Sequence, residues 1–267
     1  MRIALAASAV FLAGATGVLA SASAPVTFVW PSSVAVEPSG SLLVVENGLH
    51  RLVRVDPKTG HVTQLAALTK PFAVQRTASG TTYVTDGPLL RRFVGTRTVV
   101  VTRASGDIGP IAIDRNGTVY FATANALFAL PGGKGPAVRI APGTRFSNPH
   151  GLGVEPDERL VVSDTNAHRL LLVEPASGQT RVLAHVEAPA GLAIGSDGSI
   201  YVADIGTSRV LHLNSGGKRL GFVGKVFEDP YDVELAPGRV VYVVESLAVG
   251  DLRRVAPNGT VTTVSSR

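Results

Sequence analysis

Short apolar runs recur along the chain at a spacing of about forty residues. Six apolar triplets mark the repeat, and their last residues lie 38, 39, 41, 40 and 41 positions apart: 34–36, 72–74, 111–113, 152–154, 192–194 and 233–235. Each triplet is followed by a turn, a β-rich run, a second alternating run, another turn and a last short strand. Four short strands within about forty residues are typical of one β-propeller blade. The pattern therefore predicts an all-β, six-bladed β-propeller with four antiparallel strands per blade.

The fourth copy, residues 148–186, shows the pattern most clearly. Its apolar runs predict an innermost strand over 152–154, a second over 160–163, a third over 169–173 and an outer strand over 180–184. Pro, Asp and Gly in the intervening segments favour tight turns, and strands joined by such short turns are antiparallel. The expected blades lie near these residues: 31–69, 70–107, 108–147, 148–186, 187–227 and 228–267.

Two segments compete for the outer-strand position of the sixth blade. Residues 26–30 immediately precede the first innermost strand, so by their phase in the repeat they belong to that position. Residues 260–264 have the same claim from the other end of the chain. Either the N-terminal segment completes the last blade, or the C-terminal segment completes it and the N-terminal strand lies beside it.

The first 24 residues differ in kind from the rest. Residues 3–20 are an apolar stretch rich in Ala and Leu, and the small residues 20–24 follow it. This layout is typical of a secretory signal peptide cleaved near residues 22–24. The alternative is an uncleaved membrane anchor, because such a stretch approaches the roughly 20 residues that span a bilayer. The small-residue pattern favours cleavage, so we expect residues 25–267 to form a secreted, periplasmic or cell-envelope propeller.

The composition of the chain limits the kinds of binding partner that we expect. The chain has 25 Lys and Arg against 20 Asp and Glu, and the basic residues are scattered through all the repeats. Nucleic-acid-binding proteins instead concentrate basic residues on one face. No cysteine is present, so the stability of an exported protein must come from packing and ring closure. We expect a monomer that binds a small polar ligand, a glycan or another protein, and no nucleic acid.

The chain resembles the NHL repeat. The resemblance is carried by Asn-Pro-His-Gly-Leu at 148–152 and Val-Val-Ser-Asp-Thr-Asn-Ala-His-Arg-Leu at 161–170, with echoes at 189–194 and 201–204. NHL proteins and the related gluconolactonase/regucalcin, strictosidine synthase and virginiamycin B lyase groups form six-bladed propellers. The resemblance therefore implies that fold over residues 31–267. It implies no single activity, because these groups carry different functions on one scaffold.

Acidic residues recur where the second strand of a blade ends. Five of the six repeats carry one: Glu46, Asp86, Asp164, Asp204 and Glu245. In a propeller these positions and the segments entering the innermost strands share one face, around the mouth of the central channel. Such acids either accept hydrogen bonds from their own loops or converge on a ligand or a cation such as Ca²⁺. Recurrence favours the structural role for each acid, and all five remain candidate ligand-binding residues.

Residues that occur in one repeat only are stronger candidates for a binding or catalytic role. Among the aligned entrances to the innermost strands, only the fourth repeat carries His150, only the second carries Lys70, and only the sixth carries Tyr231 and Asp232. If His150, Tyr231 and Asp232 meet at the channel mouth, they have the chemistry of a base, a hydrogen-bond donor and an orienting acid. Lys70 is a further candidate for binding a ligand on this face.

The resemblance to gluconolactonases implies a divalent metal held by a first-blade Glu, an Asn before Gly and an Asp at a later strand entrance. The matching entrances here carry Ser32, His150 and Ala190, so metal-dependent lactone hydrolysis is not carried over. The lyase groups use more than one imidazole or carboxylate at the mouth, where this chain has one imidazole. The sequence favours a binding or protein-interaction scaffold that uses its loop-rich face. The alternative is an exported hydrolase or lyase centred on His150, so whether the protein is an enzyme stays open.

Overall fold

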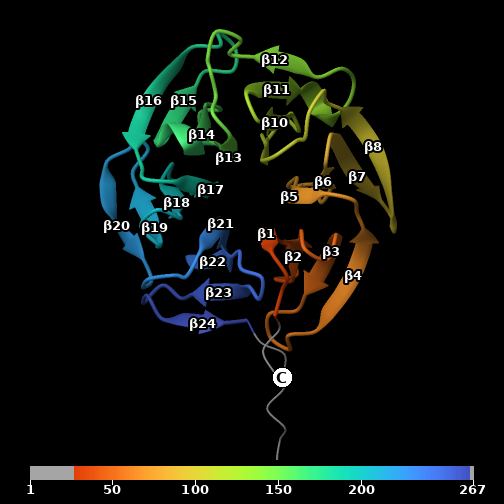
Figure 1. The fold of residues 1–267 in the computed structure, drawn as a ribbon, viewed down its shortest axis with the longest axis vertical. Coiled ribbons are helices and arrows are strands. Elements are labelled where there is room, and N and C mark those ends of the chain that lie inside the picture. The colour runs from red at the N-terminus through yellow and green to blue at the C-terminus, as the bar shows by residue number, and fades with distance from the viewer. Residues whose placement is uncertain (1–26, 265–267) are drawn as a thin grey trace, which may run out of the picture.

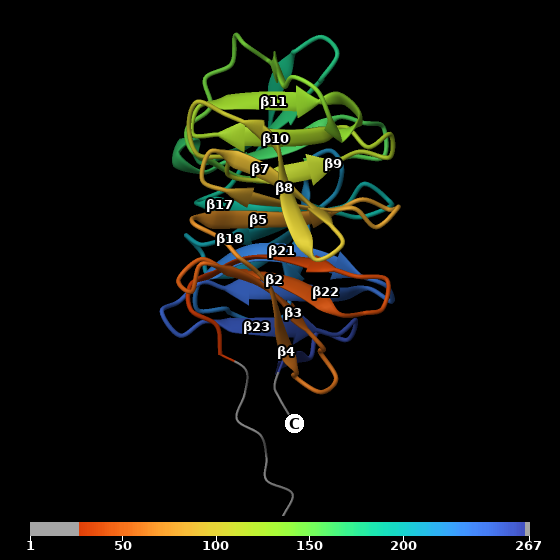
Figure 2. The same cartoon turned by 90° about the vertical axis from the view of Figure 1, so that its right-hand side faces the viewer.

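Six four-stranded sheets surround a central axis in a computed structural model that describes residues 27–264 (Figure 1). Within each sheet the strands follow chain order, and neighbouring strands are antiparallel because short turns join them. Seen edge-on, the ring is a disc with the turns of the blades on its two faces (Figure 2). The predicted six-bladed propeller is confirmed.

The strands run from the axis to the rim in each blade. The first three blades consist of β1 (Pro31–Val36), β2 (Leu42–Glu46), β3 (Arg51–Val55) and β4 (Val62–Ala67); β5 (Pro71–Arg76), β6 (Thr82–Asp86), β7 (Leu89–Val94) and β8 (Arg97–Arg103); and β9 (Ile111–Ile113), β10 (Val119–Thr123), β11 (Ala126–Leu130) and β12 (Val138–Ile140). The last three consist of β13 (Pro149–Val154), β14 (Leu160–Asp164), β15 (Arg169–Val173) and β16 (Thr180–His185); β17 (Pro189–Ile194), β18 (Ile200–Asp204), β19 (Arg209–Leu213) and β20 (Arg219–Val223); and β21 (Pro230–Ala236), β22 (Val240–Glu245), β23 (Asp251–Val255) and β24 (Val261–Thr263).

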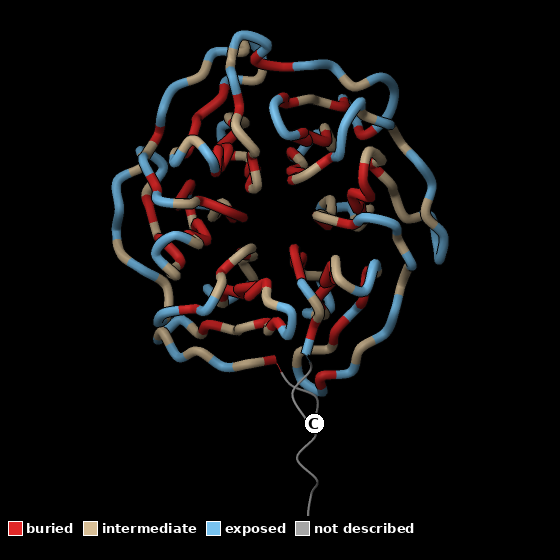
Figure 3. Tube along the Cα trace, viewed as in Figure 1, coloured by how far each residue is buried: buried red, intermediate tan, exposed pale blue. Residues whose placement is uncertain are grey.

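The core lies between the blades. Second strands such as β2 and β14 are buried at every position, which explains why they read as nearly continuous apolar runs. Six apolar clusters fill the spaces between neighbouring sheets, one for each pair of blades. Exposed backbone concentrates at the outer strands and turns (Figure 3). Burial of the inner strands between two sheets fixes their positions around the axis.

The C-terminal segment completes the sixth blade, because β24 pairs with β23. The N-terminal segment lies beside that blade: Phe28 and Gly250 exchange backbone hydrogen bonds of 3.0 and 2.7 Å, and Trp30 N–H donates to Leu247 O at 3.0 Å. Gly48 N–H also donates to Val29 O at 3.0 Å, which ties the same segment to the first blade. The second of the two closure alternatives is therefore correct.

The predicted signal peptide, residues 1–24, lies outside the described residues. Within residues 27–264, no helix has the length and apolar character needed to cross a membrane.

Candidate functional site

A proline and a β-bulge build the start of the innermost strands. Five of these strands begin with proline, each opposite the acid that ends the second strand: Pro31, Pro71, Pro149, Pro189 and Pro230. Proline is tolerated there because the first residue of a strand need not donate to the ladder. The pairing register shifts directly after each of these prolines, and such bulges redirect a side chain. The residues after the prolines are Ser32, Phe72, His150, Ala190 and Tyr231.

This register corrects the sequence alignment of the second blade. Pro71 pairs with Asp86 as Pro149 pairs with Asp164, so the counterpart of His150 is Phe72 and not Lys70. His150, Tyr231 and Asp232 also lie within β13 and β21 instead of in loops before them. The structure brings these three residues together with Phe72 and places Lys70 farther out on the same face.

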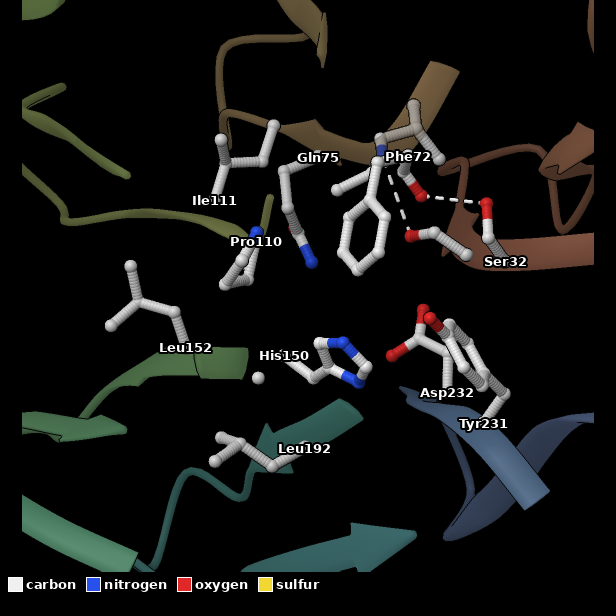
Figure 4. Close-up of a pocket in the computed structure, with 14 residues that line it drawn as sticks. Ser32, Phe72, Gln75, Pro110, Ile111, His150, Leu152, Leu192, Tyr231 and Asp232 are labelled. Carbon is white, nitrogen blue, oxygen red and sulfur yellow. Dashed lines mark hydrogen bonds between the residues drawn. The ribbon is translucent and has the colours of Figure 1, made fainter. Parts of the chain in front are cut away.

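Three rings from three blades meet at the channel mouth. The ring centroids of Phe72 and His150 lie 5.6 Å apart, those of His150 and Tyr231 5.4 Å, and those of Phe72 and Tyr231 6.2 Å. Figure 4 shows the imidazole facing Tyr231 and Asp232, with the Phe72 ring beside them. The cavity that they line with Ser32 and other residues holds only about 20 Å³, which is room for about one water molecule.

His150 is a neutral imidazole with one nitrogen unused. Burial lowers its pKa, so the charged form is disfavoured at neutral pH. Its Nε2 lies 3.2 Å from Nδ2 of Asn148, and an amide nitrogen is a donor, so Nε2 accepts and the proton resides on Nδ1. Nδ1 is buried and has no hydrogen-bond partner among the described residues. The site therefore has an unused N–H donor among aromatic rings.

Two carboxyls follow along β21. Burial raises the pKa of Asp232 to about 7, although hydrogen bonds from Val34 N–H, at 3.0 Å, and from Ser33 lower it. Burial and then the nearby Asp232 charge raise the pKa of Glu234 to about 8. Successive side chains alternate across a strand, so these two lie on one face of β21. Glu234 lines a cavity of about 200 Å³ farther along the innermost strands, together with Gln75.

Tyr231 adds a second donor to the mouth. Burial first, and then the nearby charges of Asp229 and Asp232, raise the pKa of Tyr231 to about 12. The phenol therefore stays protonated across the physiological range. Together with the His150 N–H, its hydroxyl offers donors to an oxygen atom of a ligand.

The mouth continues outward as a cleft of about 240 Å³ over the second, third and fourth blades. Phe72 and His150 line both the small axial cavity and this cleft. At its outer edge Lys70 Nζ lies 2.5 Å from Asp107 Oδ2, and both side chains are more than half exposed. The cleft thus has an aromatic inner end and a charged outer end.

The five rim acids are engaged by their own blades and by the segments that lead into them. Each side chain is at most 3% exposed and accepts a hydrogen bond from a backbone N–H. Four also pair with an arginine of the third strand: Glu46 with Arg51, Asp86 with Arg91, Asp164 with Arg169 and Glu245 with Arg253. Asp204 instead accepts a 2.7 Å hydrogen bond from the Thr207 hydroxyl. These carboxylates hold loops and strands together and do not converge on the axis.

The pKa of Asp86 illustrates that engagement. Burial alone would raise it, but the backbone N–H groups of Lys70 and Thr69, each at 2.7 Å, and the Arg91 guanidinium outweigh the burial and lower the pKa. The ionised form is therefore favoured by groups of the fold itself.

The residues at the strand entrances do not fit the metal that gluconolactonases hold. Ser32 donates its hydroxyl to Phe72 O at 2.7 Å, and Ala190 has no side-chain donor atom. In residues 27–264, no three His, Cys, Asp or Glu side chains are grouped so as to hold a metal ion. A metal ion such as Zn²⁺ or Ca²⁺ is normally held in a protein by several such side chains. These side chains therefore do not form the metal site of a gluconolactonase.

Comparison with known proteins places the chain among six-bladed propellers. The family model of the NHL repeat matches residues 146–171, which lie around β13 and β14 and include His150. No curated protein sequence matches the chain.

Several solved structures share the fold. Virginiamycin B lyase from Staphylococcus aureus has a TM-score of 0.69 at 12% identity, over 90% of this chain and 85% of that one. A gluconolactonase from Xanthomonas campestris has a TM-score of 0.73 at 15% identity, over 85% and 86%. A luciferin-regenerating enzyme has a TM-score of 0.74 at 14% identity, over 90% and 96%. Identities this low establish the shared fold and no shared activity.

Sequence analysis missed three residues of this site. Phe72 stands in an apolar triplet and was counted only as a marker of the repeat, although the other triplets begin with aliphatic residues. Glu234 stands at the centre of a triplet where the other blades have Ala or Gly, and that charge is a signal of an axial side chain. Asn148 gave no signal beyond its place in the repeat, because only the folded backbone brings its amide to His150.

Proposed function

We propose that this chain is an exported binding propeller whose loop-rich face takes a small ring-shaped ligand that carries an oxygen acceptor. The ligand's ring would lie in the cleft of about 240 Å³ against Phe72, and only its oxygen would enter the small axial cavity, where it would accept the hydrogen bond of His150 Nδ1–H. The outer part of such a ligand would lie in the cleft that Lys70 and Asp107 border.

The unused Nδ1–H of His150 is the observation that carries this proposal. A buried donor without a partner costs about 1–3 kcal/mol, so a fold retains one where something else satisfies it. The surrounding rings supply the apolar contact, and small-molecule sites combine mostly apolar walls with a few placed polar groups. All five rim acids are already bound by groups of the fold, so they do not offer a site for a cation. This favours a ligand with a neutral oxygen acceptor over a cationic ligand.

A second candidate function is an exported hydrolase or lyase at the same mouth. The specific observation in its favour is a neutral imidazole that faces Tyr231 and a carboxyl whose pKa burial raises to about 7. This function requires the other tautomer, in which Nδ1 is unprotonated: His150 would then act as a base through Nδ1 and Asp232 as a proton donor. The fold shared with virginiamycin B lyase and a gluconolactonase makes their chemistries the first to assay.

The test compares two six-membered rings. δ-Valerolactone carries a carbonyl acceptor, and tetrahydropyran has the same ring without that carbonyl. We expect δ-valerolactone to shift the NMR signals of His150, Tyr231 and Phe72 and to bind about tenfold more tightly than tetrahydropyran, the effect of about one hydrogen bond. His150→Phe keeps a ring and removes Nδ1–H, so this variant should bind the two compounds equally.

Three outcomes decide between the proposals. Selective, unreacted binding of the lactone that His150→Phe abolishes supports the binding function. Hydrolysis of the lactone, or turnover of virginiamycin B, that His150→Phe abolishes while the fold is unchanged supports the enzyme and overturns the binding function. Absence of any shift at the three rings at millimolar ligand overturns both.

A further inference from the structure

A second cavity lies on the opposite face of the disc, at the seam between the first and second blades. It has a volume of about 530 Å³, within the range of small-molecule sites. It is bordered by the turns after β1 and before β6 and by the turn between β7 and β8, whereas the channel mouth lies where the second strands end. We call this cavity the seam groove, and nothing in the channel-mouth site depends on it.

The seam groove has an apolar floor and polar walls. Leu43 is buried at its base, and Leu65 and the Phe93 ring extend the apolar surface. Thr63, Thr82 and Thr96 line the walls and carry hydroxyl groups. An aromatic ring beside several neutral hydrogen-bonding groups is suited to a sugar ring, which has apolar C–H faces and hydroxyl edges.

Two arginines share a single carboxylate in the groove. Arg54 donates to Glu37 through Nε at 2.5 Å and Nη2 at 2.9 Å. Arg76 Nη1 lies 3.6 Å from the same carboxylate, and Arg76 Nε donates to Gly80 O at 3.1 Å. The hydrogen bonds of Arg54 within residues 27–264 leave its Nη1 unused, and about half of its side chain is exposed. The groove therefore has an excess positive charge and free guanidinium donors.

Another cavity on the same face shows that this charge is local. That cavity, of about 470 Å³ over the third to fifth blades, contains one arginine, Arg115, among Asp114, Glu155 and Glu158. Arg115 Nε pairs with Glu158 at 2.5 Å, the same distance as the shortest Arg54–Glu37 contact. The two cavities are similar in size and opposite in charge, so only the seam groove is suited to an anion.

We propose that the seam groove binds an acidic saccharide, a sugar ring carrying a carboxylate. The carboxylate would accept hydrogen bonds from Arg54 and Arg76, because guanidinium groups pair with carboxylates in a bidentate geometry. The ring would pack on Phe93, and its hydroxyls would meet the threonine side chains. Glu37 holds both arginines in place when the groove is empty and competes with the ligand for them.

Because Glu37 competes with the ligand for Arg54 and Arg76, its removal tests the proposal. We would titrate the protein with digalacturonate, with neutral cellobiose and with inorganic phosphate, and follow the amide NMR signals of Gly80, Gly95 and Thr96. Digalacturonate should bind at least about tenfold more tightly than cellobiose, since one charge-assisted interaction is lost in the neutral sugar. Glu37→Gln should increase its affinity about tenfold because a rival carboxylate is removed.

A second variant keeps the test decisive if Glu37→Gln destabilises the fold. Arg76→Gln retains the Arg54–Glu37 pair and should weaken digalacturonate about tenfold. Arg115→Gln is the matched control and should leave the affinity unchanged. Equal effects of Arg76→Gln and Arg115→Gln, or no shift at the groove amides, would overturn the proposal. Phosphate binding as tight as that of digalacturonate would show simple anion attraction and would overturn the saccharide assignment.

Discussion

Replacing Asp164 by Asn should destabilise the fold by about 3 kcal/mol with no ligand present. Asp164 is 0% exposed and accepts hydrogen bonds from Ser147 N–H at 2.5 Å and from Arg169 Nε at 2.9 Å. An Asn side chain retains one oxygen acceptor, so the substitution removes the ion pair and leaves one hydrogen bond. Hydrogen bonds to charged groups contribute about 1.5–3 kcal/mol. The partial exposure of Arg169 limits the loss to the lower end of the 3–5 kcal/mol typical of a broken buried pair.

Urea unfolding followed by circular dichroism measures this change directly, and a thermal scan should show a Tm lower by about 6–12 °C for a chain of this size. Asp107→Asn is the matched control, because the Lys70–Asp107 pair is also short but exposed. Exposed pairs contribute about 0–1 kcal/mol, so the control should unfold almost as the parent does. If the two variants unfold alike, or if Asp164→Asn loses ligand binding while keeping full stability, our assignment of the rim acids to the fold is wrong.

Three further predictions concern the axis and the N-terminus. A Cβ on Gly191 would clash with Asp232 Oδ1, so Gly191→Ala should destabilise the fold by about 2 kcal/mol and disturb the channel mouth. Gly221 has open space around it, so Gly221→Ala should leave the stability unchanged. Urea unfolding of the two variants measures both effects. The raised pKa of Asp232 and of Glu234 means that the folded chain holds protons that the unfolded chain has lost, so their contribution makes stability fall as pH rises from about 4 to about 8. Glu234→Gln should flatten that slope, and an unchanged slope contradicts the burial of this carboxyl. Mass spectrometry of exported protein should find an N-terminus at residue 23 or 25, whereas an intact residue 1 supports the anchor.

The blade pattern was predictable because strand burial repeats with the chain. A second strand packed between two sheets must be apolar at nearly every position, and tight turns require Gly, Pro, Asn or Asp, so both signals recur every forty residues. The order of closure was not predictable, because residues 26–30 and 260–264 have the same β-rich character. Backbone hydrogen bonds from Phe28 and Trp30 to the loop before β23 decide between them.

The site was predictable only in part. His150, Tyr231 and Asp232 broke the repeat and were found for that reason. Phe72 was missed because the apolar triplet of the second repeat begins one residue after Pro71, whereas in the four other blades that begin with proline it begins three residues after it. Counting from that triplet therefore shifted the second blade by two positions and pointed to Lys70.

The role of the rim acids also had a sequence signal. An arginine follows the acid by five residues in four blades, and three of these form ion pairs: Glu46 and Arg51, Asp86 and Arg91, Asp164 and Arg169. Asp204 and Arg209 have the same spacing, but Asp204 accepts a hydrogen bond from Thr207 instead. Because this spacing joins the end of one strand to the start of its antiparallel neighbour, it indicates a pair within the blade.

A crystal structure of the protein soaked in δ-valerolactone tests the central claim most directly. We predict the lactone ring in the cleft of about 240 Å³ against Phe72, its carbonyl oxygen at the channel mouth within hydrogen-bond distance of His150 Nδ1, and the rim acids still bound to the fold. A ligand held by the rim acids, or a mouth that stays empty at a concentration that saturates the NMR shifts, would contradict the account.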